Sequence, residues 1–534
     1  MVALLFVVAA TAPAQSLPTR HVRKEIASGE AYFVSRLPAT QSLHLDIALP
    51  LRNHSELNDL LQNLSDHQSP SFQQFLSVAE FTERFGPTEG DYRAVIRFAE
   101  QNGLRVTGTS ANRVILNVAG SVANIERAFQ VTMAFYQHPT EPRTFYSPDR
   151  EPSAAGLTVP LWHISGLNNF SIPHPASLRR NLDAAARVTG SGPGGNFLGS
   201  DMRAAYYGGT AYTGAGQSLG LVEFGGYNIG DVKEYFASVG QPFNVPVLGI
   251  STDGSPLACT DGCSSDLEQA LDIEEAISMA PGLQQVRVYV ARASDVDIFN
   301  QMATDNIAKT LSCSWGWSPE DPTSDDPIFE EFEAQGQILF VASGDKGAYQ
   351  AGELDLYPAY DVYAVSVGGT VLTTKGAGGA WESETAWSDS GGGIAPDIPI
   401  PDYQLIRGVI TKANQGSLTL RNCPDVSLEA NNDNYICFNG SCAGGWGGTS
   451  FAAPRWAAYL ALLNQQRVAD GTPTISGFHH AIYTIGVGPG YSSFFHDITT
   501  GSNGKYSAEI GYDLATGWGS PNGPALFEYL ATKK

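Results

Sequence analysis

The chain has 534 residues, of which 43% are hydrophobic and 16% are charged, and its net charge at pH 7 is −23. The charge is uneven, because residues 185–534 contain 38 Asp and Glu against 16 Lys and Arg, whereas the first 184 residues contain 16 against 15. A strongly acidic second part argues against nucleic acid or anionic membranes as partners, and it suits a protein that stays folded and soluble at low pH. The length favours two or more domains.

The first 14 residues resemble a signal peptide. An apolar run from Met1 to Ala10 precedes Ala12-Pro13-Ala14, a small-residue pattern that is typical of a cleavage site. A positively charged start is missing, but the pattern still predicts a secreted, extracellular protein. No apolar run reaches the length of a transmembrane span.

Residues 25–172 are predicted to form an α+β domain. Hydrophobic periodicity indicates strands at 44–51, 104–109, 113–119 and 131–136, and amphipathic helices at 56–64, 92–102 and 122–129. This order favours a ferredoxin-like sandwich. Residues 173–195 follow as a linker, where Pro, Gly, Ala and a pair of Arg predict a flexible and cleavable segment.

Residues 196–534 alternate between predicted strands and helices. Strands are expected at 219–223, 285–290, 310–315, 338–342 and 362–367, and helices at 229–239, 265–280, 296–305 and 327–335. Such alternation predicts an α/β fold, in which helices cover both faces of a mostly parallel sheet.

All six cysteines lie in this second domain. An even number in a secreted chain favours disulfides, and Cys259 with Cys263 and Cys437 with Cys442 are close enough to close small loops. Other pairings remain open. Cys313 lies in an apolar run and is expected to be a free, buried thiol. Zinc is not expected, because no C-x-x-C pair occurs and no histidine lies among the cysteines.

A glycine-rich stretch at 444–448 leads into Thr449 and Ser450, and an apolar run at 451–463 then predicts a buried helix. A serine at this junction is well placed to act as a nucleophile, because the first N–H groups of a helix can stabilise an oxyanion. The alternative is an ordinary glycine-rich turn with an N-capping serine. The partners of Ser450 must decide between the two.

The histidines restrict the choice of a base for Ser450. None of the ten lies between His174 and His479, so a triad in the order Asp, His, Ser would need a histidine from the linker or the first domain. The order Ser, Asp, His remains open through His479, His480 or His496. Hydrolases with that order place the nucleophile in G-x-S-x-G, whereas this serine lies in G-T-S-F-A-A-P.

Carboxyl groups are the better candidates. Glu268 and Asp272 are one helical turn apart in an otherwise apolar run, which places both on one helix face. Two close carboxylates resist double ionisation, and a carboxylate base matches an acidic working pH. Asp345 directly follows the predicted strand 338–342, where parallel sheets place active sites, and in its neutral form it could donate a hydrogen bond to an oxyanion. A solvated acidic helix face and a simple turn are the alternatives.

In this order, Glu268-x-x-x-Asp272, Ser-Gly-Asp345-x-Gly and Gly-Thr-Ser450-x-x-x-Pro resemble the motifs of the sedolisin (serine-carboxyl) peptidases, which include kumamolisin-like enzymes. The resemblance implies a subtilisin-like catalytic domain preceded by an activation pro-domain. It implies that Ser450 is the nucleophile and Glu268 the general base. It also implies that Asp272 orients Glu268 and that Asp345 is the oxyanion donor.

The resemblance implies further positions. Glu223 and Trp315 resemble, more loosely, residues that extend the hydrogen-bond network in some members, although a polar residue at a strand end and a core aromatic would look the same. One structural Ca²⁺ is implied near the C-terminus. Its ligands would be the side chains of Asp497 and Asp513 and the main-chain carbonyls of Ile498, Glu509 and Gly511.

These patterns together predict a secreted, acid-acting serine-carboxyl endopeptidase, made as a zymogen that processes itself. Its substrates would be proteins or peptides, and its own pro-domain would be an intramolecular inhibitor. We expect a monomer without nucleic-acid or membrane partners. An inactive secreted homologue that acts as a binding protein, a tripeptidyl-type exopeptidase and a Ser-Asp-His ester hydrolase are the alternatives.

Overall fold

The computed structural model describes residues 17–176, 179–180, 189–209, 211–259, 266–292, 294–350 and 356–532. The predicted signal peptide and part of the predicted linker lie outside these residues. The described chain forms two compact units: one within Met1–His54, Val78–Phe170 and Thr323–Pro327, the other within Ser55–Ser77, Ser171–Pro322 and Ile328–Lys534. Among the described residues, no helix has both the length and the apolar character that a membrane span requires.

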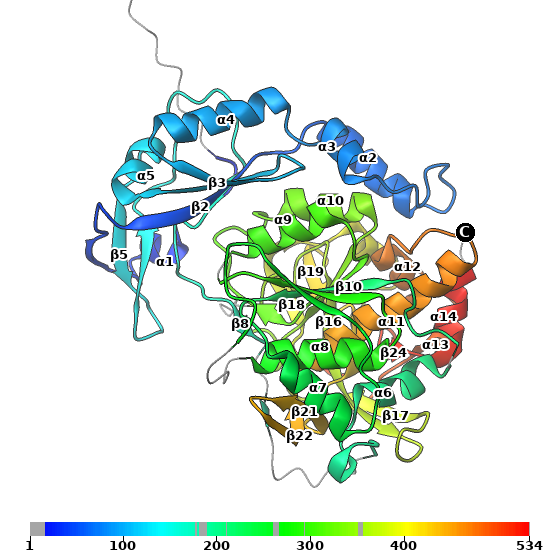
Figure 1. Ribbon diagram of the computed structural model, residues 1–534. Coiled ribbons are helices and arrows are strands. Elements are labelled where there is room, and N and C mark those ends of the chain that lie inside the picture. The colour runs from blue at the N-terminus through cyan, green and yellow to red at the C-terminus, as the bar shows by residue number, and fades with distance from the viewer. Residues whose placement is uncertain are drawn as a thin grey trace, which may run out of the picture. The chain divides into compact units, whose positions relative to one another are not determined.

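The first unit contains an antiparallel sheet in the order β3-β4-β2-β7, with helices packed on it (Figure 1). Its elements are β2 (Ser42–Ala48), α4 (Glu89–Gln101), β3 (Arg105–Thr109), β4 (Ile115–Ser121), α5 (Val122–Phe129) and β7 (His163–Ser165). This β-α-β-β-α-β succession confirms the ferredoxin-like arrangement. The strand expected at 131–136 forms as β5 (Met133–Gln137), but it joins β1 (Phe33–Arg36) and β6 (Thr144–Pro148) in a separate sheet. The fourth strand of the main sheet is instead β7.

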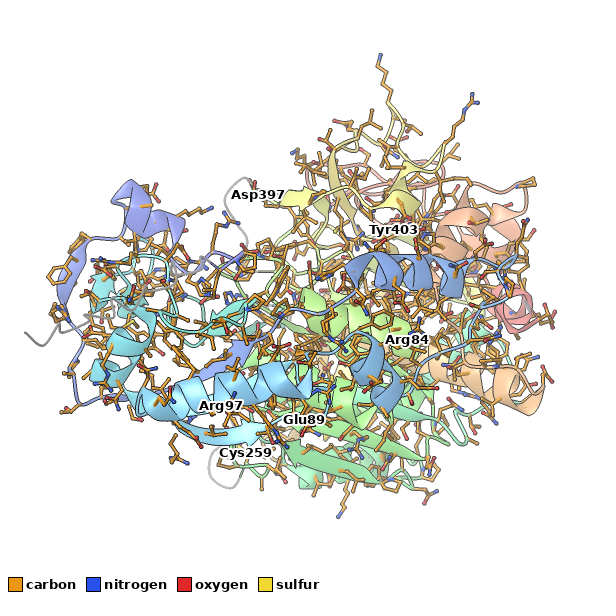
Figure 2. The ribbon with its side chains drawn as sticks, turned by 90° about the horizontal axis from the view of Figure 1, so that it is seen from above. Arg84, Glu89, Arg97, Cys259, Asp397 and Tyr403 are labelled. Atoms are coloured by element: carbon orange, nitrogen blue, oxygen red, sulfur yellow. A yellow bond between two sulfur atoms is a disulfide. The ribbon has the colours of Figure 1, made fainter. Side chains whose placement is uncertain are left out.

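Helix α4 illustrates how the sequence forms this layer. At its start, the Thr88 hydroxyl accepts a hydrogen bond from the Asp91 N–H, which satisfies one of the unpaired donors of the first turn. Phe98 is buried on the inner face. Glu89 and Arg97, labelled in Figure 2, are exposed. The helix is therefore amphipathic, as its periodicity predicts.

The second unit is organised around an eight-stranded sheet of described residues in the order β11-β12-β10-β13-β15-β16-β17, with β20 paired to β16. Its parallel strands are β10 (Ser218–Glu223), β11 (Val247–Ser251), β12 (Gln285–Val290), β13 (Thr310–Cys313), β15 (Ile338–Ala342), β16 (Val365–Thr374) and β20 (Val426–Glu429). Only β17 (Trp381–Ala386) runs antiparallel among these described strands. The sheet is thus mostly parallel, as predicted.

Helices cover both faces of this sheet. Figure 1 shows α9 (Asp295–Asp305) and α10 (Asp326–Gln335) on one side, and α7 (Ile229–Ser238) and α8 (Leu267–Met279) on the other. The α/β fold with helices on both faces is confirmed. Shorter elements complete the described chain: α1 (Lys24–Ser28), α3 (Val78–Arg84), α6 (Gly199–Met202), β18 (Gly393–Pro399), β19 (Leu420–Cys423), α12 (Phe478–Gly486), α13 (Tyr491–Phe494), β23 (Phe495–His496), β24 (Ser520–Pro521) and α14 (Gly523–Thr532).

Helix α11 (Thr449–Ala469) is the central element of the second unit. It packs against α8, β13 and β15, and its side chains from Thr449 to Asn464 are buried on every face. A helix that is buried all round needs apolar residues all round, which explains the continuous apolar run in the sequence. This helix carries Ser450 at its start.

Part of the predicted pro-domain belongs to the second compact unit. Residues Ser55–Ser77, which include most of α2 (His54–Ser65), cluster with it. The Leu76 N–H donates a hydrogen bond to the Ala334 carbonyl at 2.9 Å, and Arg467 Nη2 donates to Gln73 Oε1 at 2.5 Å. The two compact units therefore interleave along the chain.

The predicted pairing of Cys437 with Cys442 is confirmed. The disulfide joins the two strands of a hairpin, β21 (Asn434–Phe438) and β22 (Ser441–Gly447). Cys259 is also disulfide-bonded, while Cys263 lies outside the described residues. Cys313 is a free, buried thiol as expected, and so is Cys423.

Candidate active site

The candidate nucleophile lies at the carboxyl edge of the parallel sheet. Ser450 is in the first turn of α11 and is fully buried. Asp345 follows the end of β15, and Glu223 is the last residue of β10. Because parallel strands end at the same edge of a sheet, residues that are distant in the sequence meet there.

Helix α8 supplies the two carboxyl groups that the sequence singles out. Glu268 and Asp272 are both fully buried, and α8 packs directly against α11. The charges of Asp272 and Asp345 both raise the pKa of Glu268, and the Ser450 hydroxyl lowers it by hydrogen bonding. The structure therefore brings all four predicted catalytic residues together.

Burial dominates the electrostatics of this cluster. Desolvation is the main cause that raises the pKa of Glu268 well above its usual value. Desolvation also raises the pKa of Asp272 to about 8, although hydrogen bonds with Ser314 and Glu223 lower it. The pKa of Glu223 is raised by burial and then by the charge of Asp272. Neighbouring carboxyls that are this poorly hydrated share protons instead of ionising together.

The contact between Ser450 and Glu268 is loose. The hydroxyl is close enough to affect the pKa of Glu268, but neither group makes a hydrogen bond of ordinary length. Catalytic hydrogen bonds are often long before substrate is engaged and shorten in the reacting complex. The geometry thus permits proton transfer between the two groups once the contact shortens.

Ser314 was not singled out by sequence reasoning. Its hydroxyl donates to Asp272 Oδ1 at 2.7 Å and lies 3.5 Å from the main-chain carbonyl oxygen of Ser450. The next residue, Trp315, donates from Nε1 to Glu223 Oε2 at 2.9 Å. Glu223 and Trp315 are therefore joined to the carboxyl cluster. The available signal was a polar residue directly after a buried strand of a parallel sheet.

Asp345 is held in place by the residue that precedes the nucleophile. Thr449 donates to Asp345 Oδ1 from both its main-chain N–H at 2.7 Å and its hydroxyl at 2.8 Å. The Thr449 hydroxyl in turn accepts from the Gly344 N–H at 3.0 Å. Sequence reasoning did not assign this role to Thr449, although the threonine is part of the Gly-Thr-Ser450 motif.

The histidines do not serve Ser450. Its hydroxyl makes no hydrogen bond to any described residue. The three C-terminal histidines have other partners: Asp425 at 3.5 Å for His479, Asp402 at 3.2 Å for His480, and the stacked Trp381 ring at 3.8 Å for His496. The alternative of a Ser-Asp-His hydrolase therefore finds no support in the described structure.

The two predicted calcium-binding carboxylates lie in the loops between β23 and β24. The Gly511 N–H donates to Asp497 Oδ1 at 3.1 Å, and the Glu509 N–H donates to Asp513 Oδ2 at 2.9 Å. Both carboxylates act on Tyr491, because their charges raise the pKa of its phenol. Burial raises the pKa of Asp513 to about 7. A bound cation would offset this desolvation, and paired carboxylates among main-chain carbonyls fit Ca²⁺.

Comparison with known proteins matches this architecture. A family model described as Pro-kumamolisin, activation domain, matches residues 30–170. Sedolisin from Pseudomonas sp. (strain 101) is 28% identical over 538 residues, which cover 92% of this chain and 88% of the relative. Kumamolisin from Bacillus sp. (strain MN-32) is 28% identical over 551 residues, which cover 95% and 96%. The solved structure of Pseudomonas sedolisin, a serine-carboxyl proteinase complexed with two molecules of pseudo-iodotyrostatin, superposes with a TM-score of 0.55 and 26% identity, and covers 64% of this chain and 98% of its own.

The chain belongs to the sedolisin family.

As a member of this family the chain is a serine-type peptidase, and it carries an N-terminal activation domain. The solved sedolisin matches about the share of the chain that follows the linker, which agrees with the subtilisin-like fold expected for the catalytic domain. The activation domain includes the segment Ser55–Ser77 that clusters with the catalytic unit.

Proposed function

We propose that this sedolisin-family chain is a secreted, acid-acting serine-carboxyl endopeptidase that is made as a self-processing zymogen. One observation carries the proposal: Ser450 lies in a buried cluster of carboxyl groups, with no described histidine bonded to it. A serine hydroxyl needs a base to become nucleophilic, and here only carboxylates are near enough to act as one.

In the proposed mechanism, Ser450 Oγ attacks the carbonyl carbon of a peptide bond while Glu268 accepts the hydroxyl proton. Asp272 holds Glu268 through a shared proton, and Ser314 orients Asp272. Glu268 passes the proton to the departing amine, which leaves an acyl-enzyme. Water then attacks the ester, Glu268 takes a proton from that water, and Ser450 is released with its proton restored.

The oxyanion of the tetrahedral intermediate is proposed to receive hydrogen bonds from Asp345 and from the Ser450 N–H. Both hydrogen bonds from Thr449 fall on Oδ1 of Asp345, so Oδ2 is the atom that would carry a proton. Only a neutral carboxyl can donate in this way. Donation therefore requires a pH at which Asp345 is protonated.

The mechanism needs one ionised and at least one protonated carboxyl in the cluster, so kcat/KM should fall on both sides of an acidic optimum. As pH rises toward the pKa of Asp272, about 8, the shared proton is lost and activity should fade. The measurement is kcat/KM for a peptide substrate between pH 2 and 8. A profile that stays flat up to pH 8 would contradict the carboxyl mechanism.

Replacing Ser450 by Ala tests the proposal most directly. The variant should keep its activation domain after acidification and should lose casein hydrolysis by about 10⁴-fold or more. Glu268→Gln keeps the size of the side chain but removes the base, and it should show the same two losses. Clean processing of purified Ser450→Ala would mean that another protease matures the chain, and residual activity would point to another nucleophile.

We also propose that Asp497, Asp513 and the main-chain carbonyls of Ile498, Glu509 and Gly511 hold one structural Ca²⁺. Binding to the folded state alone stabilises it by mass action, so Ca²⁺ should raise the Tm of the Ser450→Ala precursor and chelation should lower it by several degrees. Asp497→Asn should abolish the difference between the two conditions. A Tm that is the same with calcium and with chelator in the unmodified site would refute the calcium site.

A further inference from the structure

The segment that joins the activation domain to the catalytic unit is paired with the catalytic unit at two places. Strand β8 (His174–Pro175) runs antiparallel to β14 (Trp315–Gly316), with Pro175 opposite Trp315 and His174 opposite Gly316. Further along, β9 (Arg179–Arg180) runs antiparallel to the end of β22, with Arg179 opposite Gly447. All four strands belong to the same compact unit.

The two places lie on opposite sides of the candidate nucleophile. Trp315 directly follows Ser314, whose hydroxyl bonds Asp272 and lies 3.5 Å from the Ser450 carbonyl oxygen. Gly447 lies just before the first turn of α11, which contains Ser450. The linker therefore passes Ser450 as an extended chain that adds a strand on each side. Peptides bind to exposed strand edges in this manner.

The register identifies the residue that meets the nucleophile. The Ala176 N–H donates to the Ser314 carbonyl at 3.0 Å, and Ala176 is only 3% exposed. Ser314 is the residue of this strand edge that contacts both Asp272 and Ser450. Pairing with β22 resumes at Arg179, so only the short stretch from Ala176 to Arg179 can present a peptide bond to Ser450.

We propose that Ala176 supplies the carbonyl that Ser450 attacks, so that the first maturation cut separates Ala176 from Ser177. This inference rests on the proposed function. Ser450 Oγ bonds to the Ala176 carbonyl carbon, Glu268 takes the hydroxyl proton, and the bond to the Ser177 nitrogen breaks as Glu268 passes that proton to it. Water then hydrolyses the ester, which leaves the Ala176 carboxylate and restores Ser450.

The proposal also states what the cleft accepts. The acyl side of the cut is His174-Pro175-Ala176, and the Ala176 methyl group is buried against the catalytic unit. A pocket that encloses a methyl group has no room for a long charged side chain, whose burial without a partner is also costly. The site therefore takes a small apolar residue on the acyl side of the cut bond.

The experiment follows the intact purified precursor after a drop to acidic pH, with samples quenched by base from the first seconds onward. Mass spectrometry of the released activation fragment should show that the first species to appear ends at Ala176. Reading this end avoids later trimming of the mature N-terminus. A first fragment that ends at any other residue would overturn the assignment.

Two variants and a peptide sharpen the test. Ala176→Arg should slow the first cut at least tenfold, whereas Ala184→Arg, the same change beyond the second paired strand, should leave the rate within twofold. A synthetic peptide that spans residues 172–180 should be cut after Ala176 by the mature enzyme, a result that does not depend on how the variants fold. If the peptide is cut only elsewhere, or if both variants process equally fast, the inference fails.

The two proposals fail differently. If the Ser450→Ala precursor is processed, or if the wild-type protein does not hydrolyse casein, the proposed function is wrong. If the wild-type protein hydrolyses casein and cuts itself first at another bond, only the assignment of Ala176 is wrong.

Discussion

Ser314 connects two parts of the active site through one hydroxyl group. It donates to Asp272 at 2.7 Å, and its own main-chain carbonyl accepts from Ala176. A hydrogen bond to an ionised partner contributes about 1.5–3 kcal/mol. Loss of this bond should loosen the orientation of Asp272 without removing any reacting group.

We expect Ser314→Ala to lower kcat by about tenfold or more, with little change in KM and with a shift in the acidic limb of the pH–rate profile. Ser312→Ala is a matched control, because Ser312 lies on the same strand, is fully buried and has a hydroxyl without a hydrogen-bond partner. Steady-state kinetics of the matured enzymes measure the difference. Equal effects of the two substitutions would show that the Ser314 hydroxyl only fills space.

At the scale of elements, a buried ion pair sets α8 against α11. Arg455 on α11 donates from Nε to Glu275 Oε2 on α8 at 2.7 Å, and both side chains are fully buried. Arg455 also donates to Asn434 Oδ1 at 2.7 Å and to the Glu429 carbonyl. Because Ser450 and Glu268 lie on the same two helices, this pair helps to fix the distance between them.

Removing one partner of a buried pair leaves the other without a counter-charge, which typically costs about 3–5 kcal/mol. We therefore expect Arg455→Ala to lower the free energy of unfolding by about this amount and to reduce kcat as the helices shift. Urea unfolding of the Ser450→Ala background measures the stability change. The double variant Arg455→Met with Glu275→Gln removes both charges and should recover part of the loss. A single variant that is as stable as its parent would mean that the pair does not hold the helices together.

At the scale of the whole molecule, buried carboxyls couple folding to pH. Desolvation raises the pKa of Asp266 to about 6, of Glu330 to about 7 and of Asp361 to about 7. A carboxyl whose pKa is higher in the folded state binds its proton more tightly when folded. It therefore stabilises the fold below its unfolded pKa, near 4, and that stabilisation is lost as pH rises through the folded value.

The urea midpoint of the Ser450→Ala precursor should accordingly fall as pH rises from about 4 to about 8. Asp425 acts in the opposite sense, because Arg421 holds its pKa far below the usual value, but its contribution is lost only in stronger acid. Glu274 is fully buried, and desolvation raises its pKa well above the usual range. Glu274→Gln should therefore flatten the decline. A midpoint that rises toward neutral pH would contradict this account.

Much of the fold could be predicted because its elements have strong local signals. The strand Gln285–Val290 and the strand Ile338–Ala342 form at the predicted residues, since buried parallel strands are short, continuous apolar runs. Helix Val122–Phe129 does so as well, with an N-capping serine at its start. Strands β1, β6 and β17 were not predicted, because edge strands with mixed polarity have no clear periodicity.

The sequence by itself determined the chemistry available to this protein. A serine at a loop–helix junction, carboxyls at one-turn spacing in an apolar helix and a central region without histidines are enough to restrict the possible bases, because residue types and short spacings are local properties. Tertiary structure alone decided which distant groups meet. It places Ser314 on Asp272, joins residues Ser55–Ser77 to the catalytic unit, moves β5 to a separate sheet and lays the linker past Ser450. Such contacts depend on the packing of residues far apart in the chain, and no local pattern encodes them.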